Sequence, residues 1–206
     1  MAPSGQQTPI LILASASPRR ESLLNLAGYP PDRIIPAHID EAPMPGELPA
    51  AQAKRLAIEK ARAVAEDHPG ALVLGADTVV ACGRRILPKA ENEDQARAFL
   101  EMLSGRRHRV YGGVCLIGSD GNAHAKCVMT AVTFKRLGGE DIRGYIDSGE
   151  WRDKAGAYAI QGRAGAFVRR LNGSYPNVVG LPVFEVSAML AGLGLKPSPA
   201  AAEKSQ

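Results

Sequence analysis

The sequence predicts an α/β fold built on a mixed β-sheet with helices packed against it. Short continuous apolar runs, which are typical of buried strands, alternate along the chain with stretches whose apolar residues recur every three or four positions. Hairpin turns are also present, so some neighbouring strands are expected to run antiparallel. The 206 residues are 45% hydrophobic and 22% charged, which matches soluble globular proteins and suffices for one large domain or two lobes.

The first part of the chain predicts two strands and two helices. Residues 9–14 (PILILA) form an apolar run typical of a buried strand. Ser17 and Pro18 suit the N-cap and the first position of a helix that Gly28 would close. Residues 34–37 predict a second strand, and after a proline-rich loop the spacing of apolar residues in 53–64 predicts an amphipathic helix.

The middle of the chain predicts a strand that is followed closely by a carboxylate side chain. Residues 71–75 (ALVLG) predict a buried strand that ends just before Asp77, and residues 79–87 predict a hairpin that turns near Gly83. Asn92 can cap a helix that runs to about Leu103, because Gln95 stands in the capping-box position.

The last part of the chain predicts one long hairpin and two more helices. The turn sequence SDGN at 119–122 predicts that strands at 110–117 and 123–134 pair antiparallel. A short helix at about 140–146, a hairpin at residues 172–173 (NG) and a final helix at 183–193 complete the expected elements.

Composition restricts the compartment and the class of partner. Lys and Arg number 25 against 21 Asp and Glu, so the net charge is +4, which allows nucleic acid, an anionic surface or a phosphate-bearing ligand. Three cysteines without zinc-type spacing favour a reduced, cytoplasmic protein. No run approaches the roughly 18 apolar residues of a membrane helix, and the first residues lack the features of a secretory signal, so neither is expected.

Residues 13–20 (LASASPRR) carry the features of a phosphate-binding segment. A strand is expected to end there and a helix to begin, so free N–H groups and the positive end of the helix dipole would face an anion. Ser15, Ser17, Arg19 and Arg20 could then hold phosphate oxygens. The alternative is an ordinary capped helix with two surface arginines. Neither a P-loop nor a dinucleotide-binding glycine motif is present.

Carboxylates and lysines form the remaining candidate groups. Glu41 and Asp77 each follow a predicted strand, where a carboxylate can bind a divalent cation or act as a general base, although a solvated turn is the alternative for Glu41. Lys60 falls among the apolar positions of its helix, which indicates either a buried role or snorkelling. Lys89 and Lys154 lie in polar segments further along and complete the basic set.

Taken together, these segments resemble the Maf (septum-formation Maf-like) family of nucleoside triphosphate pyrophosphatases. The matching stretches are LASASPRR (13–20), RLAIEKA (55–61), GADTVV (75–80), DKAGAYAIQG (153–162) and NGSYPNVVGLP (172–182). The resemblance implies two lobes around a central cleft, as in Maf and ITPase folds, within a single catalytic domain at 9–195 between flexible ends at 1–8 and 196–206. It also implies hydrolysis of an acid anhydride, nucleoside triphosphate to monophosphate and pyrophosphate, with a divalent cation such as Mg²⁺ or Mn²⁺.

The resemblance also implies roles for individual residues. Asp77 matches the family's proton acceptor, and Arg19, Arg20, Glu41, Lys60 and Lys89 match its other functional positions. In the branch that acts on dTTP and UTP, which this chain resembles, specificity is associated with the positions of Arg19, Thr78 and Gln161. The amide of Gln161 offers a donor and an acceptor to a pyrimidine edge. Ala90 departs from the family, which usually has proline after the lysine.

These features give one expected function and two alternatives. We expect a cytoplasmic homodimer that converts dTTP and UTP to monophosphates, clearing non-standard pyrimidine nucleotides as well, with Asp77 as catalytic base and Glu41 and Asp77 as metal ligands. One alternative is a non-catalytic protein that binds nucleic acid or a division partner. Against nucleic acid, aromatic residues make up only 5% and acidic groups flank the basic ones. The other alternative is the same chemistry on a modified purine nucleotide such as 7-methyl-GTP.

Overall fold

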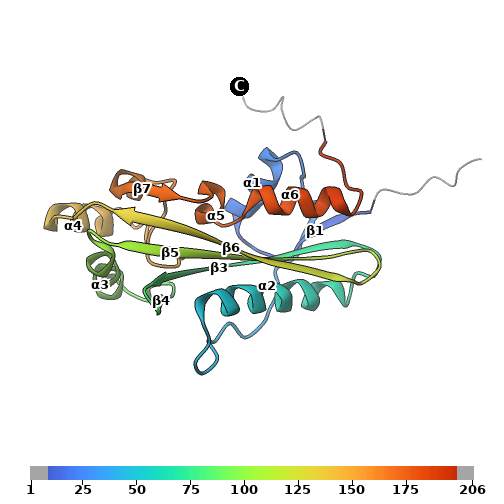
Figure 1. The fold of residues 1–206 in the computed structure, drawn as a ribbon, viewed down its shortest axis with the longest axis horizontal. Coiled ribbons are helices and arrows are strands. Elements are labelled where there is room, and N and C mark those ends of the chain that lie inside the picture. The colour runs from blue at the N-terminus through green and yellow to red at the C-terminus, as the bar shows by residue number, and fades with distance from the viewer. Residues whose placement is uncertain (1–8, 199–206) are drawn as a thin grey trace, which may run out of the picture.

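The fold is organised around a single seven-stranded mixed sheet. The computed structural model describes residues 9–198. The strand order is β2-β1-β3-β5-β6-β7, with β4 paired to β3. In Figure 1 the long β5–β6 hairpin runs the length of the molecule, with α2 below it and α1 and α6 above it. The segments expected to be flexible, 1–8 and 196–206, lie outside the described residues except for 196–198.

The elements follow one another in a mixed order of strands and helices. The strands are β1 (Leu11–Leu13), β2 (Arg33–Ile34), β3 (Leu72–Cys82), β4 (Arg85–Leu87), β5 (Arg107–Ile117), β6 (Ala123–Phe134) and β7 (Val168–Asn172). The helices are α1 (Pro18–Leu26), α2 (Pro49–Ala65), α3 (Glu93–Leu103), α4 (Gly139–Asp147), α5 (Tyr175–Val179) and α6 (Val183–Gly192), with a 3₁₀ helix η1 at Arg163–Phe167. None of the helices in 9–198 combines the length and apolar character needed to cross a bilayer.

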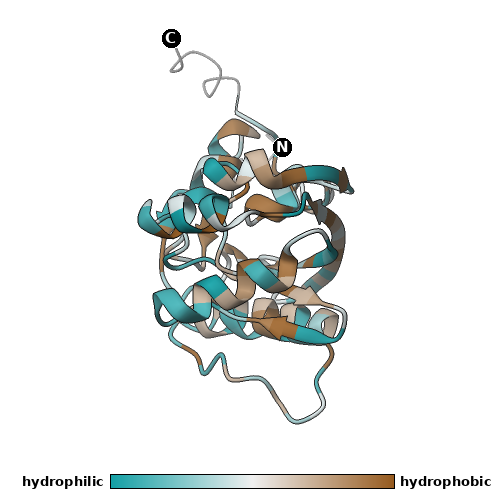
Figure 2. Cartoon of the chain, turned by 90° about the vertical axis from the view of Figure 1, so that its left-hand side faces the viewer, coloured by the Kyte–Doolittle hydropathy of each residue, from teal (hydrophilic) through white to brown (hydrophobic). Residues whose placement is uncertain are grey.

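The first lobe packs helices on both faces of the sheet. On one face, Ala57, Ala61 and Val64 of α2 lie in a buried cluster with Ile12 of β1 and Val73 of β3. On the other face, a second cluster joins residues of α1 and α6 to the same strands: Leu24, Val186, Leu190, Leu72, Leu74, Val114 and Leu116. Figure 2 shows the helices banded in teal and brown, as expected for elements with one exposed and one buried face.

The second lobe has its own core at the other end of the β5–β6 hairpin. Phe99 of α3 and Tyr145 of α4 are buried with Val110 of β5 and Phe134 of β6 in a third cluster. Three separate clusters on one continuous sheet confirm the expected mixed α/β fold with two lobes.

Two glycines let α2 lie directly on the sheet. A Cβ at Gly75 of β3 would lie 2.3 Å from the carbonyl oxygen of Ala57, and one at Gly113 of β5 would lie 1.9 Å from that of Ala53. Both distances are far below van der Waals contact, so only glycine permits this approach. The consequence is that side chains on the buried face of α2 reach β3 at close range.

Most predicted elements are confirmed, but one predicted hairpin and the ends of two predicted strands are wrong. The strand predicted at 34–37 is β2, which covers only Arg33–Ile34. The Asn92 cap is present, with the Gln95 amide N–H donating to Asn92 Oδ1 at 2.9 Å, and the long hairpin joins β5 to β6 as expected. No hairpin forms at residues 172–173, because β7 ends at Asn172 and Ser174 caps α5 instead. The strand predicted to end at residue 75 continues to Cys82, since β5 pairs with it along its whole length from Val73 to Ala81.

Replacing Gly75 with alanine is expected to destabilise the protein by about 3 kcal/mol, because the added methyl group must push α2 off the sheet. Urea unfolding would measure the loss. Gly144→Ala is the matched control: it lies in α4, with nothing within 4 Å of the new Cβ, and should be neutral or slightly stabilising. Equal stability for both variants would contradict the close packing of α2 on β3.

Candidate functional site

The candidate site lies at a gap in the edge of the sheet. On one edge of β3, Leu72–Leu74 pair with β1 and Val80–Cys82 pair with β4. Within the described part of the chain, no strand pairs with residues 75–79 on that edge. A cleft of about 790 Å³ opens there between the lobes, and this volume is typical of a small-molecule site.

The cleft collects every side chain that the sequence predicted for the site. They come from α1 and the loop before it, from the loop between β2 and α2, from α2 and β3, and from the segments after β4 and after α4. The residues are Ser15, Ser17, Arg19, Arg20, Glu41, Lys60, Asp77, Thr78, Lys89, Lys154 and Gln161. Asp77 lies within β3, and not after the end of a strand as the sequence predicted. Because β1 stops at Leu13, the carboxylate still lies beyond the end of the parallel pair β1–β3.

A buried lysine holds two carboxylates at the centre of the cleft. Lys60 Nζ donates to Asp77 Oδ1 at 2.7 Å and lies 2.7 Å from Glu41 Oε1. Lys60 and Asp77 are each only 8% exposed, so the snorkelling alternative for Lys60 is wrong. A buried charge needs a partner, and here the ammonium and the Asp77 carboxylate compensate each other. The approach of α2 at Gly75 permits this contact.

Glu41 differs from Asp77 in its exposure. Its side chain is 50% exposed. Burial alone would raise the pKa of Glu41, but the hydrogen bond from Lys60 and the positive charges of Lys60, Lys89 and Arg20 outweigh it, so the pKa lies below its ordinary value. Glu41 is therefore an ionised carboxylate that faces both the lysine and the solvent.

The loop that carries Glu41 is tied to α2 by one arginine. Arg55 Nε donates to Glu47 Oε1 at 2.7 Å, and Arg55 Nη2 donates to Glu47 Oε2 at 2.8 Å and to the carbonyl of Ala42 at 3.2 Å. The contact between Arg55 and Glu47 is bidentate, so it fixes the orientation of the two side chains as well as the distance between them. Arg55 thus positions the loop so that Glu41 meets Lys60.

Arg20 connects three elements around the other side of β3. Its Nη1 donates to Ser15 Oγ at 2.9 Å, its Nη2 to Thr78 Oγ1 at 3.2 Å, and its Nε to the carbonyl of Gly180 at 3.0 Å. Burial lowers the pKa of Arg20, with the charge of Asp77 opposing that shift. Since successive side chains of a strand point to opposite faces, Thr78 meets Arg20 while Asp77 meets Lys60.

Ser17 occupies the N-cap position of α1, as predicted, but its side chain makes no capping hydrogen bond. Its backbone N–H donates to Ser15 Oγ at 3.3 Å, so that hydroxyl accepts from both Arg20 and Ser17. Both serines line the cleft. The segment therefore presents a folded loop and a helix start to the cleft, as expected for anion binding.

Arg19, Lys89 and Lys154 form a basic wall. Burial lowers the pKa of Lys154, and the positive charges of Arg19 and Lys89 add to that shift, which places the three cations within electrostatic reach of one another. Lys89 is fixed by a bridge between its backbone and that of Ala155. The departure at position 90, where Ala90 replaces the usual proline, leaves Lys89 in the cleft wall.

The segment behind Lys154 is conformationally strained. Asp153 and Ala157 adopt positive φ angles of 57° and 56°, a region that costs residues other than glycine about 1–3 kcal/mol each. Gly156 between them also has a positive φ, and a Cβ there would lie 2.8 Å from Val80. Residues with strained backbone angles cluster at functional sites in proteins. The strained segment lies in the wall of the cleft, as expected for a functional site.

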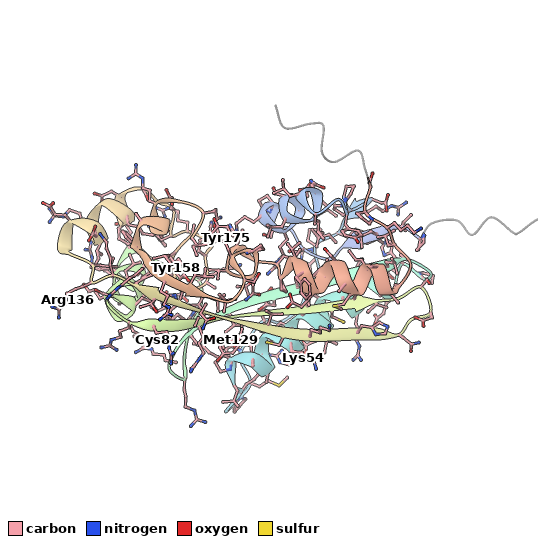
Figure 3. All side chains as sticks on the ribbon, turned by 45° about the horizontal axis from the view of Figure 1, so that its top comes forward. Lys54, Cys82, Met129, Arg136, Tyr158 and Tyr175 are labelled. Atoms are coloured by element: carbon pink, nitrogen blue, oxygen red, sulfur yellow. The ribbon has the colours of Figure 1, made fainter. Side chains whose placement is uncertain are left out.

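Tyr158, which follows this segment, lines the cleft, and Figure 3 places it in the second lobe. Its hydroxyl lies 2.8 Å from His108 Nε2, and both rings pack edge-on against Phe134. Burial lowers the pKa of His108 to about 4, so the imidazole is neutral near pH 7. The pair acts as a fixed support for the cleft wall.

Sequence reasoning missed two structural residues of the site. Gly180 offers its carbonyl to Arg20, and Asn177 places the α5 segment by donating through Nδ2 to the carbonyls of Val110 and Val128 and to Thr130 Oγ1. Asn177 is fully buried and lies over Gly112, where a Cβ would be 1.9 Å from its Oδ1. Gly112 and Gly113 stand side by side within a predicted strand, and glycines there indicate that another segment packs closely on the strand. This was the only signal in the sequence that pointed to the contact with Asn177.

The described residues offer no preformed metal cage. No group of three or more His, Cys, Asp or Glu side chains within 9–198 could hold a metal ion. Cys82, Cys115 and Cys127 are free thiols. Glu41 and Asp77 are the two carboxylates that line the cleft beside Lys60.

A family model and the similar curated proteins point to the same protein family. The model of the family described as "Maf-like protein" matches residues 10–193. A dTTP/UTP pyrophosphatase of Paramagnetospirillum magneticum is 58% identical over 91% of this chain and 99% of its own length. Proteins of the same name from Caulobacter vibrioides and Rhodospirillum rubrum are 56% and 57% identical over 92% and 91% of this chain and 98% and 89% of their own lengths.

The lowered pKa of Glu41 makes folding stability depend on pH. Because the folded-state pKa lies below the ordinary 4.5, this group contributes stability above about pH 4.5 and loses it as the pH falls through the folded-state value. Urea unfolding at a series of acidic pH values should show a steeper loss for the parent protein than for Glu41→Gln. An equal loss in both proteins would contradict the Lys60–Glu41 ion pair.

Proposed function

This chain belongs to the Maf-like protein family, and we propose that it hydrolyses dTTP and UTP to the monophosphate and pyrophosphate. The relatives are named dTTP/UTP pyrophosphatases, and hydrolysis of a nucleoside triphosphate to pyrophosphate is the reaction of a hydrolase acting on acid anhydrides. The observation that carries the proposal is one cleft in which five cationic side chains stand beside a buried carboxylate. We extend the proposal to non-standard pyrimidine triphosphates, whose chemistry is the same.

The charge of the cleft matches a triphosphate. Arg19, Lys89 and Lys154 would bind the β- and γ-phosphates, while Arg20, with Ser15, Ser17 and Thr78 around it, would position the α-phosphate. Gln161 lies exposed at the wall of the same cleft, and its role at the pyrimidine edge stays a prediction.

Asp77 is placed to accept the proton of the attacking water. Within the described residues, only Lys60 hydrogen-bonds its side chain, through Oδ1, so Oδ2 is left for the water. The water oxygen forms a bond to the α-phosphorus, the bond from that phosphorus to the bridging oxygen breaks, and pyrophosphate leaves with the electron pair. Lys60 fixes the orientation of the carboxylate during this step.

The carboxylates also fit a divalent cation that arrives with the substrate. Mg²⁺ commonly uses one or two protein carboxylates together with substrate phosphates and water, and Glu41 and Asp77 supply two. When bound, Mg²⁺ or Mn²⁺ would neutralise phosphate charge and make water more acidic. Glu41 is half-exposed and ionised, and because Lys60 contacts its Oε1, it would contribute through Oε2.

A panel of nucleotides separates the proposal from its alternatives. Purified protein would be incubated with dTTP, UTP, dCTP, dATP and 7-methyl-GTP, and pyrophosphate and orthophosphate would be scored separately. Pyrophosphate from dTTP and UTP supports the proposal, and pyrophosphate from 7-methyl-GTP alone supports the modified-purine alternative. Absence of turnover together with salt-sensitive nucleic-acid binding would favour a binding protein.

Asp77→Asn should retain the fold and lower kcat by about 10²–10⁴-fold, because an amide cannot accept the proton. Pyrophosphate release from dTTP measures the loss, and circular dichroism checks the fold. Asp67→Asn, an exposed position outside the cleft, is the matched control and should leave kcat unchanged. Near-parental activity in a folded Asp77→Asn protein would remove Asp77 from the catalytic role.

We also propose a cytoplasmic homodimer that pairs through the segment of α5 and α6. Phe184 is 80% exposed and Tyr175 is 46% exposed, and large exposed aromatic side chains are typical of association surfaces. Figure 3 places Tyr175 beside the start of α6. The three free thiols agree with a reducing compartment.

Light scattering after size-exclusion chromatography should give twice the mass of one chain for the parent protein. Phe184→Ser should shift the population toward one chain, because it removes the most exposed of the large apolar side chains. A parent protein with the mass of a single chain at high concentration would contradict the dimer.

A further inference from the structure

The strained turn at residues 153–157 carries one cation of the basic wall and is joined to a second. The N–H of Ala157 donates to the carbonyl of Lys154 at 3.0 Å and closes the turn. Inside the turn, the backbone of Ala155 forms a bridge with that of Lys89. A shift of the turn would therefore move Lys154 and Lys89 together relative to a bound ligand.

Contacts from outside the turn hold its shape. The positive φ angles of Asp153 and Ala157 are unfavourable for residues with a Cβ, so they persist only where the surrounding structure imposes them. The N–H of Gly156 donates to the carbonyls of Leu87 and Pro88 at 2.9 and 3.1 Å, which attaches the turn to the end of β4. This attachment alone would leave the turn free to pivot about it.

Tyr158, directly after the turn, supplies an attachment to the other side of the sheet. Its hydroxyl lies 2.8 Å from Nε2 of His108 in β5. Among residues 9–198, this is the only hydrogen bond between β5 and the segment 153–162. Because β4 and β5 pair with opposite edges of β3, the two attachments span that strand. The N–H of Ala159 adds a third, to the hydroxyl of Tyr145 in α4 at 2.9 Å.

The surroundings of His108 indicate that it contributes direction to this contact. The side chain is 1% exposed and packs edge-on against Phe134. Its Nδ1 is buried and has no hydrogen-bond partner among the described residues. An apolar side chain could fill the same space without an unpaired polar atom, but hydrophobic contact is non-directional. Only a hydrogen-bonding atom at the position of Nε2 fixes where the Tyr158 hydroxyl points.

We infer that His108 is a positioning residue of the site: through Tyr158 it orients the strained turn, and with it Lys154 and Lys89, toward the substrate. Tyr158 lines the cleft, and His108 contacts it from the core of the second lobe. This inference deepens the proposed function and rests on its assignment of the β- and γ-phosphates to the basic wall.

The test compares His108→Leu with His108→Gln, two variants of similar size that differ in hydrogen bonding. The glutamine amide can replace Nε2 as the partner of Tyr158, whereas leucine cannot. Binding of inorganic pyrophosphate is measured by calorimetry, and kcat/KM is measured for dTTP, both well below the Tm of each variant. His108→Leu should weaken pyrophosphate binding and lower kcat/KM about 3- to 10-fold, and His108→Gln should stay within about twofold of the parent.

Tyr158→Phe removes the other partner of the same hydrogen bond and keeps the ring, so it tests the inference even where His108→Leu does not fold. It should give the same loss as His108→Leu, and the double variant should lose no more, because all three lack one hydrogen bond. Tyr29→Phe is the matched control: Tyr29 is buried in the first lobe, its hydroxyl forms no hydrogen bond within the described residues, and its variant should match the parent.

The other results contradict the inference or the proposed reaction separately. Parental pyrophosphate affinity in folded Tyr158→Phe protein overturns the inference, as do equal losses in His108→Leu and His108→Gln, which indicate packing alone. Additive losses in the double variant overturn it as well, and so does a parent protein that does not bind pyrophosphate. If the variants weaken pyrophosphate binding as expected but the parent does not hydrolyse dTTP, the positioning role stands and the proposed reaction fails.

Discussion

The Lys60 ammonium between Asp77 and Glu41 is the interaction on which the rest of the site depends. Removing one partner of a buried ion pair costs about 3–5 kcal/mol, because the other charge is left without compensation. Here both Lys60 and Asp77 are buried, and both distances from the ammonium are 2.7 Å. The pair therefore fixes α2, β3 and the loop of Glu41 relative to one another, and it orients the carboxylate that the proposed chemistry uses.

Two features of the backbone make that ion pair possible. Gly75 lets α2 rest on β3, so that a lysine on the buried helix face reaches a carboxylate in the strand. The edge of β3 is unpaired between the end of β1 and the start of β4, so the same carboxylate is open to a ligand. A further strand paired with this edge would stand beside the carboxylate and narrow the access of a ligand to it. Because the sheet is interrupted there, the Asp77 carboxylate of the ion pair can also act on a bound substrate.

The sequence was sufficient to predict the composition of the site but not its geometry. Local patterns predicted the strand before Ser15, the helix beginning at Pro18 and the cap at Asn92, because each depends on neighbouring residues. They could not predict that β3 continues past Asp77, since this depends on β5, which lies about thirty residues away in the sequence. Lys60 could be singled out as unusual on an apolar face, but only the structure shows its partners.

In the proposed reaction, water attacks the α-phosphorus of the substrate at Asp77, with pyrophosphate as the leaving group. Hydrolysis of dTTP in ¹⁸O-labelled water, followed by mass spectrometry of the separated products, tests this most directly. The label is expected in the monophosphate, and the pyrophosphate is expected to be unlabelled. Label in pyrophosphate, or release of labelled orthophosphate, would contradict it.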